Sequence, residues 1–181
     1  MPTAIQRKNV QLSGHPNEVN AFRRSLISKL KTIAPSYITI QKNTTALTDE
    51  FIAQRIGMIP FDQDHMEPAE LHVVGRYAKA SDFKGHACPF EDIIVAHVDD
   101  DQELHLTVEF TEGIGSDHAR FSKTCGVGMS TDQQNLSCSV SFETIFQNTH
   151  RECAQEALQY IRSQLMDLRN RLTEESLVNV T

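Results

Sequence analysis

The chain of 181 residues contains no tryptophan and only four cysteines, which stand far apart. No C-x-x-C pair is present, and His86 and Cys88 have no second closely spaced pair of ligands nearby, so we expect no zinc site, which needs about four ligands. No apolar run approaches the roughly eighteen residues of a membrane-spanning helix. The first twelve residues lack the apolar core of a secretory signal. We therefore expect an intracellular protein with reduced cysteines.

Catalytic motifs are also missing from the sequence. It has no G-x-S-x-G nucleophile elbow, no H-E-x-x-H zinc helix and no glycine-rich phosphate loop. The glycine pairs at 113/115 and 126/128 lack the further glycine or lysine of a phosphate cradle and are interpreted as turns or bulges. We therefore predict no catalytic residue, no metal ligand and no cofactor, and a protein that is not an enzyme by itself.

The charge balance argues against broad binding to nucleic acid. Seventeen basic and 24 acidic residues give a formal net charge of −7, whereas nonspecific phosphate binding needs a basic surface. The charge is uneven, because the segment 16–31 is basic while 97–103 is acidic. The acidic run at 99–101 is interpreted as a solvated turn.

Residues 16–31 are predicted to form a helix. Pro16 suits its first turn, where a missing N–H needs no partner, and Pro35 is expected to lie beyond its end. Apolar side chains recur at spacings of three, four and four residues, which places them on one helix face. They are Val19, Phe22, Leu26 and Leu30.

A strand and a short helix are predicted next. Residues 37–41 alternate between polar and apolar side chains, as in a half-buried strand. Thr48 is a candidate N-cap, with acidic residues following in the first helical turn. Gly57 is expected in the left-handed position after the helix, and Pro60 blocks its continuation.

Arg55 stands among apolar neighbours on this short helix, and two interpretations are open. It can be a solvated arginine whose aliphatic stem covers apolar surface. Alternatively, it can offer its guanidinium to a carboxylate or a carbonyl of a partner protein, because arginine pairs through a planar fork and is enriched at interfaces.

The middle and end of the chain alternate between strands and one long helix. Strands are predicted at 4–12, 71–77, 92–98, 104–110 and 136–142, and residues 78–88 are interpreted as a loop. Together with the helices, these strands predict an α+β fold. Residues 150–172 carry a narrow apolar seam with a heptad spacing. The seam can pack on this chain's own sheet and helix or on a helix of another protein; the length of the helix favours the second.

Residues 20–26 read NAFRRSL, residues 43–60 read NTTALTDEFIAQRIGMIP, and residues 115–122 read GSDHARFS. These three segments resemble the RNA polymerase alpha/D family, which includes the third-largest subunit of eukaryotic polymerase II, its archaeal D-type counterpart and the bacterial alpha amino-terminal domain. Departures from the family pattern are Gln54 for histidine, Arg120 for lysine and Phe121 for tryptophan. Only Cys88 lies where many eukaryotic members carry a zinc loop, so the loop is not expected.

The resemblance implies a non-catalytic subunit that nucleates the assembly of a DNA-directed RNA polymerase. It implies a dimerisation domain with an antiparallel sheet and two main helices, at 1–61 and 136–181, interrupted by a small β-rich insert at 62–135. This domain would pair with a smaller homologous subunit to form a heterodimer. The residues expected at that interface are Val19, Phe22, Leu26, Leu30, Leu158, Ile161, Leu165 and Leu168.

A second surface is implied for docking the second-largest polymerase subunit. DNA would then be contacted only through the complex, and no membrane partner is expected. The residues expected on this docking surface are Arg23, Arg24, Glu50, Phe51, Arg55, His118, Arg120 and Phe121.

The alternative is a freestanding dimerisation or adaptor protein with the same fold. Because the chain is shorter than cellular relatives and lacks a C-terminal DNA-binding domain after the long helix, we expect a divergent source, such as a large DNA virus. The location would be the nucleus for a cellular eukaryotic protein, and the cytoplasm or virion for a viral one.

Overall fold

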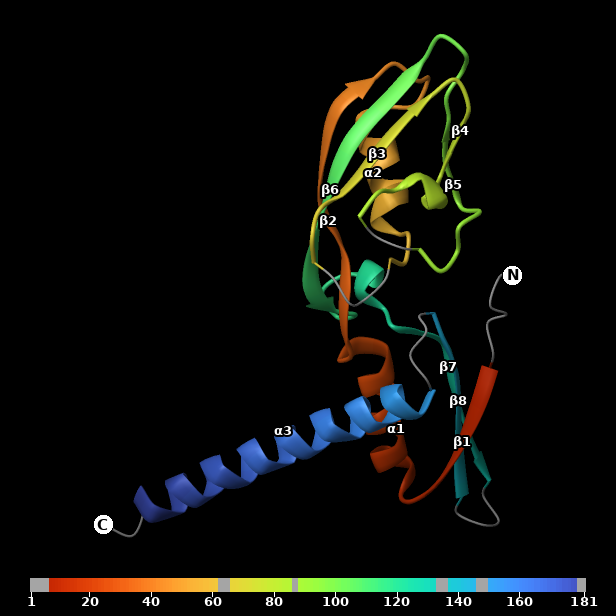
Figure 1. Ribbon diagram of the computed structural model, residues 1–181. Coiled ribbons are helices and arrows are strands. Elements are labelled where there is room, and N and C mark those ends of the chain that lie inside the picture. The colour runs from red at the N-terminus through yellow and green to blue at the C-terminus, as the bar shows by residue number, and fades with distance from the viewer. Residues whose placement is uncertain (1–6, 62–65, 86–87, 133–136, 146–149, 179–181) are drawn as a thin grey trace. The chain divides into compact units, whose positions relative to one another are not determined.

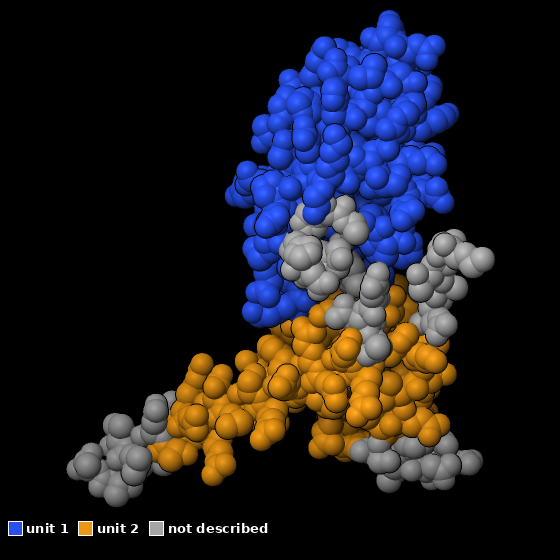
Figure 2. All heavy atoms as spheres, viewed as in Figure 1, with its two compact units in different colours: residues 1–5, 31–122, 145–147 blue, residues 6–30, 123–144, 148–181 orange. Residues whose placement is uncertain are grey.

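The computed structural model of the chain describes residues 7–61, 66–85, 88–132, 137–145 and 150–178. The fold is mixed α and β, and every strand pair in its described sheets is antiparallel. The chain forms two compact units (Figure 2). Unit 1 comprises residues 1–5, 31–122 and 145–147, and unit 2 comprises residues 6–30, 123–144 and 148–181.

Unit 1 is built on a three-stranded sheet in the order β2-β6-β3, formed by β2 (Lys31–Asn43), β6 (Glu103–Ile114) and β3 (Ala69–Val74). Helix α2 (Asp49–Gly57) lies between this sheet and a two-stranded ladder of β4 (Tyr77–Lys79) and β5 (Ile94–His97) (Figure 1). Short 3₁₀ helices, η1 (Ala80–Asp82) and η2 (Ala119–Phe121), complete the unit. The sheet, α2 and the ladder therefore enclose one core.

The core of unit 1 is centred on aromatic side chains. Phe61 is fully buried, and its ring meets those of Phe83 and Phe110 edge-on, each at a centroid distance of 5.1 Å. Edge-to-face contacts of this kind are favoured by the ring quadrupoles. Strand β3 shows a strict alternation of buried and exposed residues, as its half-buried position requires.

Unit 2 is a three-stranded sheet with helices on one face. Its sheet has the order β1-β8-β7, from β1 (Arg7–Ser13), β8 (Ser137–Thr144) and β7 (Thr124–Asp132). Helix α1 (Pro16–Ser28) covers β7 and β8, and the start of α3 (His150–Val178) packs against α1 and β8 (Figure 1). Beyond these contacts α3 extends away from the sheet of unit 2.

Helix α1 begins at Pro16 as predicted and ends three residues earlier than predicted. His15 and Glu18 form a reciprocal capping box at its start, with the His15 Nδ1 accepting from the Asn17 N–H at 3.3 Å. The helix ends at Ser28 rather than at residue 31, because Lys31 already pairs with Ile114 in the β2–β6 ladder. Strand β2 therefore begins before Pro35, so this proline does not end the helix.

Pro35 lies inside β2 instead of marking a helix end. It sits at a register shift, and β2 is an edge strand, so the missing N–H removes no ladder bond from a central strand. The predicted strand at 37–41 is the second half of β2, and its alternation is confirmed: Tyr37 is exposed, while Ile38 and Ile40 pack on the core.

The glycine predictions have mixed outcomes. Gly57 is not left-handed; it is the last residue of α2, and Met58 follows in a right-handed helical conformation. Gly126 has a φ of 58° at a register shift between β7 and β8, which confirms the predicted bulge. Gly75, with a φ of 63°, divides the predicted strand 71–77 into β3 and β4.

Strands β2 and β7 set the unit boundaries. The predicted insert begins at residue 62, but β2 and α2 precede that point and belong to unit 1, because β2 pairs along its length with β6. Strand β7, predicted within the insert, pairs with β8 in unit 2. The two compact units therefore divide at residues 30/31 and 122/123, whereas the predicted domains divide at 61/62 and 135/136.

Candidate partner-binding surfaces

Helix α3 has a packed beginning and an open continuation. Cys153 and Ala157 are fully buried in unit 2, and Ala154 and Ile161 pack partly against the same core. Leu158, in contrast, is 50% exposed. Burial raises the pKa of the Cys153 thiol to about 11, as expected where this part of the helix lies in an apolar environment.

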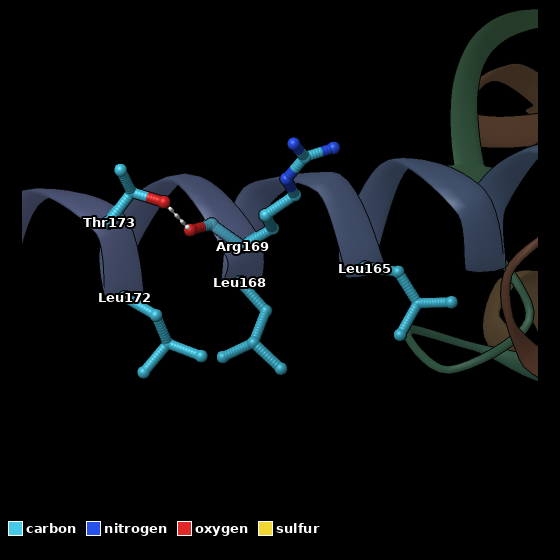
Figure 3. A pocket seen from close by; sticks show the side chains of 5 residues that line it. All are labelled: Leu165, Leu168, Arg169, Leu172 and Thr173. Carbon is cyan, nitrogen blue, oxygen red and sulfur yellow. Dashed lines mark hydrogen bonds between the residues drawn. The ribbon is translucent and has the colours of Figure 1, made fainter.

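Further exposed apolar side chains of α3 lie beyond these first turns. Figure 3 shows Leu165, Leu168 and Leu172 projecting from the same side of the helix. Their exposed fractions are between 54% and 61%, far above those of core leucines. The two interpretations of the seam thus apply to different parts: Ile161 packs within the chain, and the following leucines are uncovered.

The four predicted interface residues of α1 are buried within unit 2. Val19, Phe22, Leu26 and Leu30 are each at most 3% exposed. They form the core of unit 2 with residues of β8, such as Val140 and Phe142, and with the start of α3. Their side chains are therefore covered within the chain itself, and their contact with a partner protein stays a prediction.

The two arginines of α1 lie in unit 2. Arg23 is half-buried and its Nε donates to the Asn20 Oδ1 at 3.0 Å, while Arg24 is exposed. The other six residues predicted for docking lie in unit 1. Each group is therefore considered as a surface of its own unit.

The loop before α2 is organised by Asn43. Its Nδ2 donates to the Leu47 carbonyl at 2.9 Å and to the Asp49 carboxylate at 2.7 Å, and its Oδ1 accepts from the Thr45 N–H at 3.0 Å. Thr48 occupies the predicted N-cap position, but its side chain makes no capping hydrogen bond. The side chain of Asn43 therefore orders the loop before α2, whereas the sequence predicted that Thr48 would cap the helix.

Arg55 binds the backbone of its own unit. Its Nε donates to the Val95 carbonyl at 2.9 Å and its Nη2 to the Ile94 carbonyl at 2.6 Å, both in β5. The guanidinium also lies 5.8 Å from the centre of the Phe51 ring, and Phe51 is 45% exposed. The arginine thus joins α2 to a strand edge, which neither sequence interpretation anticipated.

The residues of η2 also make internal contacts. The His118 Nδ1 accepts from the Arg120 N–H at 3.1 Å, and the Arg120 Nη1 donates to the Pro35 carbonyl at 2.7 Å. The Arg120 guanidinium lies against Gly57, where a Cβ atom would be 3.5 Å from it. This contact links the second and third segments of the family-like sequence within unit 1.

Phe121 depends on a glycine of β6. A Cβ at Gly113 would lie 2.7 to 2.8 Å from the Phe121 ring, closer than carbon atoms can approach. The absence of a side chain at residue 113 therefore lets the ring of Phe121 pack against the strand.

The structure has a shallow groove beside Arg55 that was not predicted from the sequence. Gln54, Arg55, Met58, Ile59, Ile93 and Ile94 line it. Met58 is 53% exposed and Ile94 is 45% exposed. The spacing of Phe51, Arg55 and Met58 by four and three residues could have indicated a second, outward face of α2. The contribution of β5 could not have been found this way, because it arises from tertiary packing.

No metal site is found among the described residues. Cys88 is buried; its thiol donates to the Pro60 carbonyl at 3.2 Å, and desolvation raises its pKa. His86, the other residue of the considered pair, lies outside the described residues. None of the described helices combines the length and the apolar character that a membrane-spanning helix needs.

Comparison with known proteins finds RNA polymerase subunits. The chain is 28% identical to "DNA-directed RNA polymerase subunit Rpo3" of Natronomonas pharaonis over 129 residues, which cover 62% of this chain and 50% of that protein. It is 28% identical to the Rpo3 subunit of Methanopyrus kandleri over 135 residues, covering 61% and 49%. It is 26% identical to "DNA-directed RNA polymerases I and III subunit RPAC1" of Homo sapiens over 154 residues, covering 57% and 44%.

No protein-family model matches the chain. The chain spans about half the length of the curated relatives that it matches. These relatives come from archaea and eukaryotes, and all are named as subunits of DNA-directed RNA polymerases. The chain is therefore similar, over about 60% of its length, to polymerase subunits of the Rpo3 and RPAC1 type.

Proposed function

We propose that this chain is a non-catalytic assembly subunit of a multisubunit DNA-directed RNA polymerase. The similarity to Rpo3 and RPAC1 subunits carries this proposal. The uncovered apolar seam of α3 supports it independently, because a soluble protein rarely leaves a row of leucines exposed unless a partner covers them.

Unit 2 is the proposed dimerisation domain, which pairs with a smaller homologous subunit. The exposed leucines of α3 would make this contact, while the buried residues of α1 hold the sheet and the helix in place. The pairing surface then consists of Leu158, Leu165, Leu168 and Leu172, with Ile161 at its inner end.

Unit 1 is the proposed docking domain for the second-largest polymerase subunit. Arg55 of α2 and Met58, the residue after α2, line the groove, and the half-exposed Phe51 and Glu50 precede them on α2. Arg23 and Arg24 of unit 2 would provide a second, separate contact.

DNA would be reached only through the assembled enzyme, in the nucleus of a eukaryote, or in the cytoplasm or virion of a viral system.

Co-purification tests the function directly. The affinity-tagged chain is expressed in the organism that encodes it, isolated at physiological salt and analysed by quantitative mass spectrometry. We expect the second-largest polymerase subunit and one small homologous subunit to be enriched in near-equal amounts with the chain. An unrelated tagged protein of similar acidity serves as the control for nonspecific capture.

The alternative function predicts a different set of proteins. A freestanding adaptor would recover partners that include no large polymerase subunit, and this result would overturn the assembly role. Recovery of the small subunit alone would retain dimerisation and reject docking by unit 1.

A further inference from the structure

Arg120 connects three elements of unit 1, although it belongs only to the short helix η2. Its Nη1 donates to the Pro35 carbonyl of β2 at 2.7 Å, and its guanidinium lies against Gly57, the last residue of α2. The side chain is half-buried. A single arginine therefore joins η2 to β2 and to α2, and all three elements lie within unit 1.

The carbonyl that Arg120 binds lies at an irregular point of β2. The ladder between β2 and β6 shifts its register between Pro35 and Tyr37, and β2 is an edge strand of its sheet. A register shift interrupts the regular hydrogen bonds of a ladder, and an edge strand has no second neighbouring strand to replace them. Arg120 therefore supplies a donor where the ladder itself is interrupted.

The contact between Arg120 and α2 has a flat geometry. A Cβ at Gly57 would lie 3.5 Å from the Arg120 Nη1, 3.6 Å from its Cζ and 3.7 Å from its Nη2. Because these three distances are nearly equal, the plane of the guanidinium faces the glycine. The last carbonyls of a helix carry a partial negative charge that attracts a cation. Arg120 thus stabilises the C-terminal end of α2 from outside the helix.

The arginine is itself held in place by its neighbours in η2. The His118 Nδ1 accepts from the Arg120 N–H at 3.1 Å and from its Nε at 3.3 Å. The Phe121 ring packs closely against Gly113 of β6. Both contacts fix η2 relative to the sheet, so the guanidinium reaches α2 from a fixed support.

The groove beside Arg55 begins where this support acts. Met58 and Ile59, which follow Gly57 directly, line the groove, whereas Arg120 is not among its lining residues. The Met58 N–H donates to the Arg55 carbonyl at 3.2 Å, and the Ile59 N–H donates back to the last turn of α2 at 3.0 Å. The shape of the groove therefore depends on the position of the end of α2.

We propose that Arg120 is a positioning residue for the docking surface of unit 1. It fixes the end of α2, and the large subunit binds the groove rather than Arg120. This inference deepens the docking role proposed above and rests on it. The sequence predicted Arg120 as a docking contact, whereas its Nη1 and Nε donate to Pro35 and His118 of its own unit.

Amide hydrogen exchange in the full chain tests the fixing of α2. The variant Arg120→Met keeps a long side chain and removes every donor. We expect the Met58 and Ile59 amides to exchange at least tenfold faster in this variant, because the lost hydrogen bond is charged, while the amides of the central strand β6 keep their rates. NMR resolves these amides individually.

Capture of the purified second-largest polymerase subunit is measured with the same variants. We expect capture by Arg120→Met to be at least threefold weaker, because apparent affinity falls with the fraction of time that the groove has its binding shape. Arg120→Lys keeps the charge and one donor and should restore most of both effects. Lys84→Met removes the same charge from an exposed residue of unit 1 and should change neither.

Three results would overturn the proposal. Weaker capture with unchanged exchange at Met58 and Ile59 would make Arg120 a direct contact. An equal acceleration of exchange in β6 would show a general effect on stability, and local acceleration with unchanged capture would remove the link to docking. The exchange measurement needs no partner, so absence of capture by the unaltered chain would instead reject the docking role of unit 1.

Discussion

The two hydrogen bonds from Arg55 to the carbonyls of Ile94 and Val95 place a charged side chain over the edge of β5. Strand edges expose unpaired carbonyls that invite other strands, and a covering side chain removes this liability. The same arginine borders the groove with Met58 and Ile94. Its contribution to docking is therefore expected to be partly indirect, through the shape of the groove.

Replacing Arg55 with alanine should weaken the capture of the second-largest subunit and leave pairing with the small subunit intact. It should also lower the free energy of unfolding by about 1 kcal/mol, because two carbonyls lose a charged donor at a partly exposed site. Pull-down of both subunits and urea unfolding measure these effects.

Met58→Glu is the matched control for this prediction. It places a charge in the same groove without removing the hydrogen bonds of Arg55. Loss of large-subunit capture at unchanged stability would identify the groove as the contact. Simultaneous loss of both subunits in Arg55→Ala would show that Arg55 is needed only for structure.

Asp82 contributes a pH-dependent part of the stability. Its Oδ2 accepts from the Arg76 Nη1 at 2.7 Å and from the Lys79 N–H at 2.8 Å. The hydrogen bond from Arg76 is the main reason that the pKa of Asp82 lies below its ordinary value. A lowered pKa in the folded state means that this stability is complete above pH about 3.9 and is lost as the pH falls through the folded value.

Asp82→Asn should therefore reduce the free energy of unfolding by about 1 kcal/mol at pH 7, and the difference from the unaltered chain should vanish at strongly acidic pH. Urea unfolding at both pH values measures the change. The control is Asp92→Asn, because the Asp92 side chain is 94% exposed and its ion pair with Lys79 should contribute little. An equal loss in both variants would contradict the assignment to Asp82.

Helix α3 illustrates how one periodic pattern can serve two purposes along its length. The seam was predicted as a continuous row from Ala154 to Leu172, because the spacing alone defines a helix face. The structure covers its first part with the core of unit 2, where Ala154 and Ile161 pack, and leaves Leu165 uncovered. The periodicity of the sequence does not show which part of α3 is covered, because the covered length depends on how far α1 and β8 extend along the helix.

The contrast between Leu26 and Leu165 tests this division. Leu26→Ala should lower the free energy of unfolding by about 2 to 5 kcal/mol, because its side chain is fully buried. Leu165→Ala, at an exposed position, should change it by less than about 0.5 kcal/mol and should weaken capture of the small subunit. Chemical denaturation and pull-down distinguish the two effects, and a large stability loss from Leu165→Ala would contradict the uncovered seam.

At the scale of the whole molecule, long-range strand pairing determines the two units. The local patterns of β2 and β6 were recognised in the sequence, but their pairing joins residues far apart in the chain, such as Ile38 and Val108, and was not. The predicted boundary at 61/62 would separate these two strands. It would also remove Ile52 of α2 from the core that contains Leu106.

Fragment expression tests the boundaries. Residues 31–122 contain the complete sheet β2-β6-β3 with α2 and should fold, with a cooperative thermal transition and dispersed amide resonances. Residues 62–135 lack β2 and α2, so they should remain largely unfolded. A folded 62–135 fragment would restore the boundary predicted from the sequence.

Local spacing in the sequence is enough to predict the apolar face of α1, the alternation in β2, β3 and β6, a turn or bulge at Gly126 and the seam of α3. These follow from spacings of two, three and four residues, which act within a few turns. Tertiary packing is needed to show that Leu26 is buried and Leu165 exposed, that Arg55 binds the backbone of β5, and that β2 pairs with β6. These properties depend on contacts between residues far apart in the chain, which local spacing does not encode.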